Sequence, residues 1–354
     1  MIKTHDFSQD YGVYNMLVLG IESTCDETAV AIVRDGKEVL SNIIASQIKD
    51  HQPWNGVVPE IASRLHLKKI IPLTEEACKT AGVELKDVDL IASSNRPGLI
   101  GGLIIGTAVA KSYAWMLDKP FIGINHMEGH LYSSHITCDI EFPYIGLLVS
   151  GGHTMIIIVK SHTEYEVIGT TIDDALGEAL DKVAKHYNIG YPGGPAIEKA
   201  ALNGDKNKFH FPISNLYKSD RLYDVSYSGI KTAAINHLEK YLVNPGDTYT
   251  VNDIAASFQH KAFDMLFRKV KKASIDYKIP RIVVGGGVSA NQYLRQMFAT
   301  LTDTQVYFPS LKYATDNAAM IAAYAYHKFQ ETGADGLDTG VYPRVTGFKI
   351  SLVQ

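Results

Sequence analysis

Short apolar runs around compact polar turns mark two places in the chain. Residues 16–33, MLVLGIESTCDETAVAIV, form a strand pattern, a polar turn and a second strand pattern, so they predict a β-hairpin. Residues 145–159, IGLLVSGGHTMIIIV, repeat that design with SGGHT at the tip. The turn ESTCDET is longer than a plain hairpin needs. Two such hairpins in one chain indicate a duplicated domain.

Between the hairpins the pattern alternates between helix and strand. It predicts a long amphipathic helix over 59–82, a strand over 88–95, a buried helix over 98–117 and a strand over 120–125. This alternation favours a mostly parallel sheet with covered faces.

After residue 170 the pattern is mainly helical. The predicted helices cover 174–187, 195–202, 228–242, 251–277, 291–301 and 315–329, with one strand from residue 281. The last helix is rich in small residues, so it could return to pack on the first domain.

Composition narrows the class of protein. At 354 residues the chain is too long for one ordinary core, and 46% hydrophobic with 20% charged residues is typical of soluble globular proteins. The net charge of −4 argues against a general nucleic-acid coat. Three cysteines without metal-ligand spacing suit a reducing cytosol. The first fifteen residues lack a signal core, and the longest apolar run, GLIGGLIIGTAVA, is too short for a bilayer, so we expect a cytoplasmic protein without a membrane anchor.

The segment INHMEGHLYSSH, residues 124–135, contains three histidines, His126, His130 and His135. A pair four residues apart lies on one helical face, about 40° apart, and can bind one metal ion. A zinc peptidase would carry a glutamate directly after the first histidine, whereas Glu128 lies about 200° round the helix from His126. Histidines without a metal remain an alternative for this segment.

A distant carboxylate could complete such a site. The segment YATDNAAM places Asp316 at a helix start, where a carboxylate is also the expected cap. Together with the histidine pair it would give three ligands and leave positions for water or substrate.

Glycine-rich segments follow several predicted elements. RPGLIGGLIIGT has the glycine spacing of a phosphate-binding P-loop, but Thr107 replaces its lysine, so close helix packing explains these glycines better. VVGGGVSAN, LLVSGGHT and the PGGP loop after Asp181 bring backbone amides near polar groups, among them Asn291 and Glu198. Each loop alone could be structural, and three in one chain favour a nucleotide site.

The ordered set GIESTCDET, VVPEIASRLH, NRPGLIGGL, NHMEGH, LLVSGGHT, EALDKVAK, YPGGP and GGVSAN resembles the TsaD family, in its bacterial and mitochondrial branch. The resemblance implies two related α/β domains of the actin, hexokinase and heat-shock-chaperone (ASKHA) superfold with a central ligand cleft. We then expect a leader over 1–15, a first domain over 16–138 with 316–345, and a second over 139–315.

The resemblance also implies an acyltransferase. It would move a threonylcarbamoyl group from threonylcarbamoyl-adenylate to N6 of the adenosine beside the anticodon, in tRNAs that read codons starting with A, and release AMP. The implied metal ligands, for iron or zinc, are His126, His130 and Asp316. The implied substrate-binding residues, which would also hold an adenine nucleotide, are Leu148, Val149, Ser150, Gly151, Gly152, Asp181, Gly194, Glu198 and Asn291. Glu27 is the candidate for positioning or deprotonating the adenosine amine, or it only fixes its loop.

The implied partners are tRNA, TsaB-like and TsaE-like proteins, and the enzyme that makes the adenylate. Two alternatives stay open. A kinase-like ASKHA protein would not need the histidine pair, and a non-catalytic scaffold would be expected to lose it. Two basic runs, RKVKK at 268–272 and LKKI at 67–70, could meet tRNA phosphates or be solvated helix faces.

Overall fold

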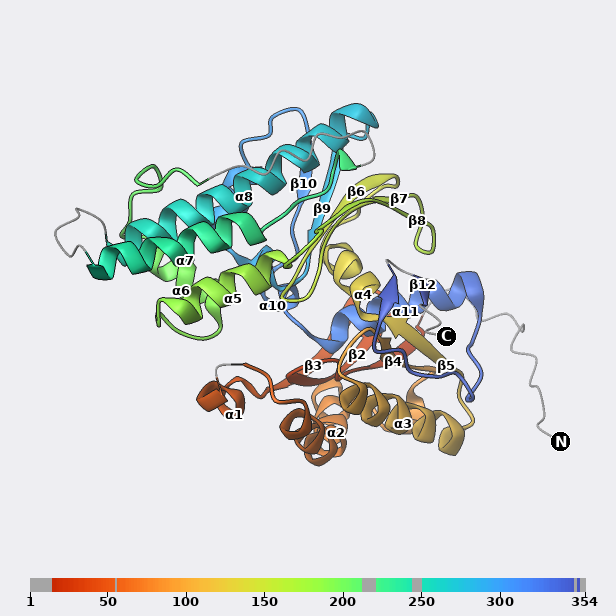
Figure 1. Cartoon of the computed structure of the whole chain (residues 1–354). Coiled ribbons are helices and arrows are strands. Elements are labelled where there is room, and N and C mark those ends of the chain that lie inside the picture. The colour runs from red at the N-terminus through yellow and green to blue at the C-terminus, as the bar shows by residue number, and fades with distance from the viewer. Residues whose placement is uncertain (1–14, 55, 212–220, 244–249, 347–348, 351–354) are drawn as a thin grey trace. The chain divides into compact units, whose positions relative to one another are not determined.

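The computed structural model describes residues 15–54, 56–211, 221–243, 250–346 and 349–350 (Figure 1). The chain divides into two compact units. Unit 1 comprises residues 1–49, 57–137 and 316–354, and unit 2 comprises residues 50–56 and 138–315. Apart from Asn15, the expected leader lies outside the described residues.

Unit 1 is built on a five-stranded sheet. Its strands are β1 (Leu17–Glu22), β2 (Glu27–Arg34), β3 (Glu38–Ser46), β4 (Leu90–Arg96) and β5 (Phe121–Asn125), in the order β3-β2-β1-β4-β5. The pairs β1–β2 and β2–β3 are antiparallel, whereas β1–β4 and β4–β5 are parallel. The predicted first hairpin is therefore confirmed.

Helices cover both faces of this sheet (Figure 1). They are α2 (Pro59–Ala81), α3 (Ile100–Leu117), α4 (His126–Tyr132) and α11 (Ala318–Thr332), whereas α1 (Ile48–His51) contains the point at which the chain passes from unit 1 to unit 2. Alternate residues of β1 face opposite layers. Leu19 and Ile21 join the core with α2 and α3, while a Cβ at Gly20 would lie 2.8 Å from the Ala322 Cβ of α11. The last predicted helix thus does return to the first domain.

Unit 2 repeats the same sheet. Its strands are β6 (Tyr144–Val149), β7 (Thr154–Val159), β8 (Tyr165–Thr170), β9 (Arg281–Gly285) and β10 (Gln305–Tyr307), in the order β10-β9-β6-β7-β8. β6–β7 and β7–β8 are antiparallel, and β6–β9 and β9–β10 are parallel. The strand order and the pairing directions match those of unit 1, so the predicted duplication is confirmed.

The helices of unit 2 pack on this second sheet around one apolar core. They are α5 (Leu176–His186), α6 (Gly193–Ala201), α7 (Ser228–Val243), α8 (Val251–Asp276), α9 (Gln292–Phe298) and α10 (Leu311–Ala314). Two short strands near the C-terminus, β11 (Val345–Thr346) and β12 (Lys349–Ile350), form an antiparallel pair in unit 1.

Two features differ from the expectation. The sheets are mixed and not mostly parallel, because β3 and β8, which the pattern did not predict, add antiparallel strands at one edge of each sheet. Both are half-exposed edge strands, so their side chains mix polar and apolar types.

The second difference is that α3 is buried on one face only. Ile104 and Trp115 are 51% and 78% exposed. By length and composition α3 could cross a membrane, as core helices of soluble proteins also could. Its other face packs closely in unit 1, since a Cβ at Gly106 would lie 2.1 Å from Ser23 Oγ. Close packing therefore explains the glycines of this segment.

Candidate functional site

Three predicted metal ligands meet in unit 1. The His pair lies on α4, with His126 as its first residue and His130 in its last turn, and the N-cap Asn125 accepts a hydrogen bond from the Met127 amide at 2.9 Å. Asp316 Oδ1 lies 3.6 Å from Nε2 of His126 and 2.9 Å from Nε2 of His130. One donor atom from each of the three residues lies within 4.8 Å of the others. Two imidazoles and one carboxylate at such distances can hold one divalent cation.

Asp316 does not cap the helix that follows it. Asn317 is the N-cap of α11, and its side chain accepts a hydrogen bond from the Met320 amide. The capping role expected for a carboxylate at position 316 is therefore wrong, because the neighbouring amide takes it. The Asp316 carboxylate points to the histidines instead.

A buried glutamate that the sequence did not single out orients the first histidine. Glu22 Oε2 lies 2.9 Å from His126 Nδ1, and its Oε1 accepts a hydrogen bond from the Thr24 amide at 2.7 Å. Glu22 is fully buried at the end of β1. When Nδ1 donates to Glu22, Nε2 is left for a metal, which is how outer carboxylates commonly orient ligating histidines. A charged residue at the end of an apolar strand was the available signal.

The charges of the group shift its proton affinities. Burial opposes a charge on His126, but the carboxylates of Glu22 and Asp316 outweigh it and raise the pKa of its imidazole to about 9. Burial and the neighbouring His126 lower the pKa of His130. Although burial alone would raise it, the two histidines hold the pKa of Asp316 well below its usual range. The site therefore combines one protonated and one neutral imidazole with a carboxylate.

Glu27 begins β2, on the other side of the same turn. Ser46 donates a hydrogen bond to its carboxylate at 3.3 Å. Burial and the negative charges of Asp316 and Asp26 raise the pKa of Glu27 to about 9. Its charge is thus sensitive to the occupancy of the neighbouring donor group by a cation.

The turn that carries these carboxylates is held by a buried histidine of α2. His66 Nε2 donates to the Cys25 carbonyl at 3.0 Å, and its Nδ1 lies 2.8 Å from Thr28 Oγ1. Because a carbonyl only accepts, the proton sits on Nε2 and Thr28 donates to Nδ1. Ser23 Oγ in turn donates to the Gly102 carbonyl of α3 at 3.0 Å.

The other polar residues of the histidine segment lie outside the donor group. His135 stacks on Tyr132, with 4.7 Å between ring centroids. Glu128 is buried on the opposite face of α4, where Lys328 and Arg96 counter the rise that burial causes in its pKa. The Glu128 carboxyl thus has Lys328 and Arg96 as its charged neighbours, and it is not one of the three residues of the donor group.

In unit 2 the second hairpin tip lies beside other glycine loops. A Cβ at Gly286, after β9, would lie 2.3 Å from the Val149 carbonyl oxygen, so these two strand ends are in contact. A Cβ at Gly177, in the first turn of α5, would lie 2.6 Å from the Ser150 carbonyl oxygen. A Cβ at Gly151 or Gly152 would meet no atom within 4 Å. The tip is therefore anchored at its base and open at its glycines.

Three further predicted residues of unit 2, Asp181, Gly194 and Glu198, lie on α5 and α6. Asp181 accepts a hydrogen bond from the Gly193 amide at 2.7 Å, and a Cβ at Gly194 would meet no atom within 4 Å. Glu198 accepts a hydrogen bond from the Gln292 amide at 2.6 Å.

Asn291 is the N-cap of α9. It accepts a hydrogen bond from the Leu294 amide at 3.0 Å and donates one to Gln259 at 3.1 Å. Asn291, Asp181 and Glu198 thus all have structural hydrogen bonds.

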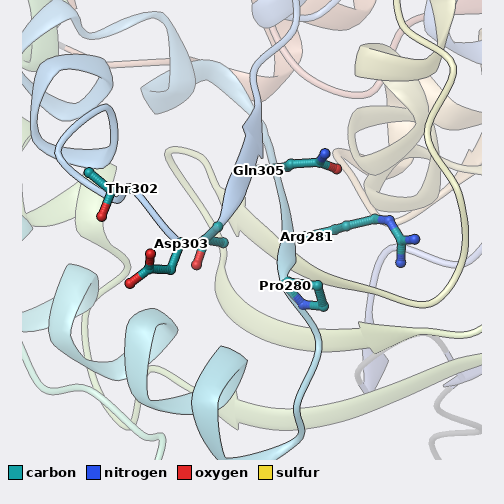
Figure 2. A pocket seen from close by; sticks show the side chains of 6 residues that line it. Pro280, Arg281, Thr302, Asp303 and Gln305 are labelled. Atoms are coloured by element: carbon teal, nitrogen blue, oxygen red, sulfur yellow. The ribbon is translucent and has the colours of Figure 1, made fainter.

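A surface hollow of about 390 Å³ lies elsewhere in unit 2 (Figure 2). Pro280, Arg281 and residues 302–305 line it, at the amino ends of β9 and β10. Ligands of α/β sheets usually bind at the carboxyl ends of parallel strands, where the glycine loops lie. No predicted site residue lines the hollow, so we do not assign the activity to it.

Comparison with known proteins identifies the family. Residues 38–323 match the sequence model of TsaD, described as tRNA N6-adenosine threonylcarbamoyltransferase. A protein of that name from Treponema denticola is 51% identical over 333 residues, covering 94% of this chain and 98% of the relative. Another from Brachyspira hyodysenteriae is 49% identical over 312 residues, covering 88% of this chain and 91% of the relative.

Solved structures share the fold at low identity. Full-length HypF in its phosphate- and nucleotide-bound form aligns with a TM-score of 0.61 at 14% identity, over 92% of this chain and 48% of that one, so the match spans about half of HypF. Component A of (R)-2-hydroxyglutaryl-CoA dehydratase from Acidaminococcus fermentans aligns with a TM-score of 0.50 at 14% identity, over 88% of this chain and 98% of that one. These likenesses agree with two related ASKHA-type domains. Because the relative from Treponema denticola is 51% identical over 94% of this chain and the TsaD model matches as well, the chain belongs to the TsaD family of tRNA N6-adenosine threonylcarbamoyltransferases.

Proposed function

We propose that this protein transfers the threonylcarbamoyl group of threonylcarbamoyl-adenylate to N6 of the adenosine beside the anticodon, in tRNAs that read codons starting with A. The observation that carries the proposal is the similarity to relatives of that activity along nearly the whole chain. In the reaction the adenosine N6 forms a bond to the carbamoyl carbon, the bond from that carbon to the AMP phosphate oxygen breaks, and N6 loses one proton. The mixed anhydride is already activated, so the protein must orient it and stabilise developing charge.

The donor group in unit 1 fits the divalent metal that the family implies. His126, His130 and Asp316 would hold it through two Nε2 atoms and one carboxylate oxygen. Iron and zinc both accept this donor set. When bound, such a cation supplies Lewis-acid stabilisation to an oxygen that gains negative charge. Glu22 contributes by fixing the ring of His126.

Glu27 is our candidate for positioning or deprotonating the adenosine amine. With a pKa of about 9 its carboxyl is protonated at neutral pH, and part of that shift comes from the Asp316 charge. A cation held by Asp316 would offset this charge and favour the carboxylate, which can accept a proton. The role of Glu27 therefore depends on the metal through charge alone.

We assign the adenylate to the glycine loops of unit 2. Leu148 to Gly152 would receive it, from the buried end of β6 through the hairpin tip, whose open glycines let backbone amides approach a phosphate closely. Asp181 and Glu198 would act mainly through the amides that they hold, and Gly194 offers open space beside Asp181. The side-chain amide of Asn291, which follows the glycine loop after β9, would contribute a hydrogen-bonding group to the same site.

The partners follow from charge and exposed surface. Two of the four cations of RKVKK are paired within α8, since Arg268 pairs with Asp264 and Lys272 with Asp276 at 2.9 Å each. With a net charge of −4, we expect the isolated chain to bind tRNA weakly and to assemble with TsaB-like and TsaE-like proteins in the cytoplasm.

A TsaB-like partner would bind the apolar side chains that α2 and α3 leave exposed. These are Leu67, Ile71, Ile100, Ile104, Trp115 and Met116.

The test is reconstitution. The protein is incubated with threonine, bicarbonate, ATP, the adenylate-forming enzyme and unmodified tRNA, with the partners added singly and together, and the digested tRNA is analysed by mass spectrometry. We expect threonylcarbamoyladenosine only when this protein is present, with the highest rate when all partners are present. Formation of the adenylate without modified tRNA would point to a non-catalytic protein, and conversion of ATP to ADP on a small acceptor would point to a kinase.

A further inference from the structure

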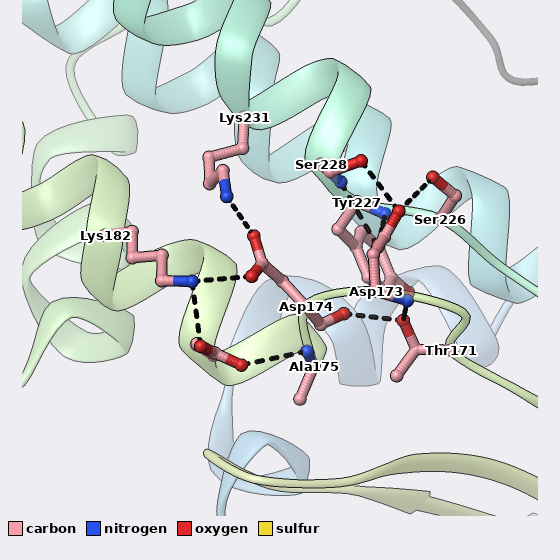
Figure 3. Close-up of polar contacts among 10 residues, drawn as sticks. Thr171, Asp173, Asp174, Ala175, Lys182, Ser226, Tyr227, Ser228 and Lys231 are labelled. Atoms are coloured by element: carbon pink, nitrogen blue, oxygen red, sulfur yellow. Dashed lines mark hydrogen bonds and ion pairs between the residues drawn. The ribbon is translucent and has the colours of Figure 1, made fainter.

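Two adjacent carboxylates occupy the turn that joins β8 to α5 in unit 2 (Figure 3). Asp173 and Asp174 belong to none of the residues to which we have given a role. Their contacts reach two helices and, through the first turn of α5, the hairpin tip.

Asp173 holds the start of α7. Its carboxylate accepts hydrogen bonds from the Tyr227 amide at 2.8 Å and the Ser228 amide at 3.3 Å. It also accepts from the hydroxyls of Ser226 and Ser228. Since the first amides of a helix lack partners within it, one carboxylate with four donors fixes the entry of α7.

Asp174 joins α5 to α7. One of its oxygens lies 2.6 Å from Lys182 Nζ of α5, and the other pairs with Lys231 Nζ of α7. The Asp174 side chain is only 12% exposed, so this bridge is less screened than a surface pair. The Thr171 hydroxyl donates to the Asp174 carbonyl at 2.6 Å and tightens the same turn.

The first amides of α5 hold the hairpin tip. The Leu176 amide donates to Thr154 Oγ1 at 2.9 Å, and the Gly177 amide donates to the Ser150 carbonyl at 3.2 Å. These bonds join α5 to both sides of the tip. Within the described part of the chain, the amides of Gly151 and Gly152 donate to no protein acceptor. The tip is thus fixed at its base and keeps two donors available.

We propose that Asp173 and Asp174 are positioning residues that hold α5 against α7 and thereby keep Ser150–Gly152 in the conformation that receives the phosphate of the adenylate. The proposal rests on the proposed function, in which this tip binds the adenylate. A glycine loop loses much conformational entropy on ordering, so a scaffold that orders it in advance increases affinity.

The test uses the full chain and a non-hydrolysable threonylcarbamoyl-adenylate analogue, titrated by calorimetry. Asp173→Asn and Asp174→Asn should each weaken analogue binding about tenfold, because part of the ordering then occurs on binding. With partners and tRNA, KM for the adenylate should rise by a similar factor while kcat stays within about threefold of the wild type. Zn²⁺ affinity should not change, since the donor group lies in unit 1.

Two comparisons separate positioning from mere stability. Asp276→Asn is the control, because Asp276 accepts hydrogen bonds from Tyr223 and Lys272 in the last turn of α8, which leads to the amino end of β9. It should leave analogue affinity unchanged. Lys231→Met should weaken binding as Asp174→Asn does, and Lys231→Arg should restore it.

Gly151→Val distinguishes this inference from the proposed function. If this variant binds the analogue like the wild type, the tip is not the adenylate site and both proposals fail. If it loses binding while the Asp173, Asp174 and Lys231→Met variants bind normally, or lose only thermal stability, the positioning role alone is overturned.

Discussion

The hairpins β1–β2 and β6–β7 occupy equivalent places in two sheets of the same strand order, yet their tips differ. The first tip, with Glu22 before it and Glu27 after it, places one carboxylate against His126 and another near Asp316. The second tip carries Gly151 and Gly152, with open space beside them. One topology thus supports a charged donor group in unit 1 and a backbone-lined loop in unit 2.

Each tip needs a support suited to its chemistry. Buried carboxylates are costly without cationic or hydrogen-bonded partners, which His126 and the Thr24 amide supply to Glu22. Glycines are costly because they lose conformational freedom, and α5 supplies the hydrogen bonds that fix Ser150. Mutations should therefore separate the two proposed roles, metal binding in unit 1 and adenylate binding in unit 2.

The largest effect is expected from His126→Ala and His130→Ala. Each should weaken Zn²⁺ binding about 100-fold, since four-ligand zinc sites bind with 10–16 kcal/mol, or about 3 kcal/mol per ligand. Transferase activity should fall with metal content while the circular dichroism spectrum stays unchanged. Affinity for the adenylate analogue should also persist.

His135→Ala is the matched control, because His135 belongs to the same segment but stacks on Tyr132. It should retain the metal. Full activity in a metal-free protein lacking both His126 and His130 would contradict the role of the pair.

Gly194→Val should give the opposite pattern. The side chain would occupy open space beside Asp181, and overpacking costs of 1–3 kcal/mol correspond to about 5- to 140-fold weaker analogue binding. Zn²⁺ affinity should be that of the wild type. Unchanged analogue affinity would remove Gly194 from the adenylate site.

Glu22→Gln should weaken Zn²⁺ binding by about tenfold, the lower range for partners that orient metal-bound histidines. The amide keeps the size of the side chain but loses the charge that favours donation from His126 Nδ1. Glu38→Gln is the control, since Glu38 pairs with Arg34 at 2.9 Å at the turn between β2 and β3, in the same sheet. Equal Zn²⁺ affinities in the two variants would show that Glu22 has only a structural role.

The smallest expected effect is the release of a proton from His126 when Zn²⁺ binds. Because the pKa of His126 is raised to about 9, its imidazole is protonated at pH 7 and must lose that proton when it binds a metal. Zn²⁺ titrations at pH 7 in buffers of different ionisation enthalpy should show release of about one proton, and affinity should rise with pH up to about 9. Heats independent of the buffer would place the metal elsewhere.

The pattern of hydrophobic and polar positions predicted the features that depend on residues close together in the sequence. The two hairpins and the shared face of His126 and His130 follow from periods of two and four residues, and the structure has both. The strands β3 and β8 were missed because half-exposed edge strands lack a clear alternation.

The pattern of hydrophobic and polar positions does not predict contacts between residues that are far apart in the sequence. Glu22 and His126 are 104 residues apart, and His130 and Asp316 are 186 residues apart. The exposed side of α3 was also missed, because an apolar helix gives no sign of which face stays outside the core. The sequence offered Asp316 as a candidate ligand and the family resemblance agreed, whereas the contact of Glu22 with His126 required coordinates.

The return of α11 to the first sheet has a consequence for synthesis of the protein. Gly20 packs against Ala322, and Asp316 completes the donor group that His126 begins, so unit 1 lacks one layer and one ligand until almost all of the chain has been made. At translation rates of 5–20 residues per second, the interval between His130 and Asp316 lasts roughly 10 to 40 s. During that time unit 2, which is almost continuous in sequence, is complete before its neighbour. The nascent chain therefore carries two histidines and an uncovered face of β1, and a metal held by all three residues of the donor group could be acquired only at the end of synthesis.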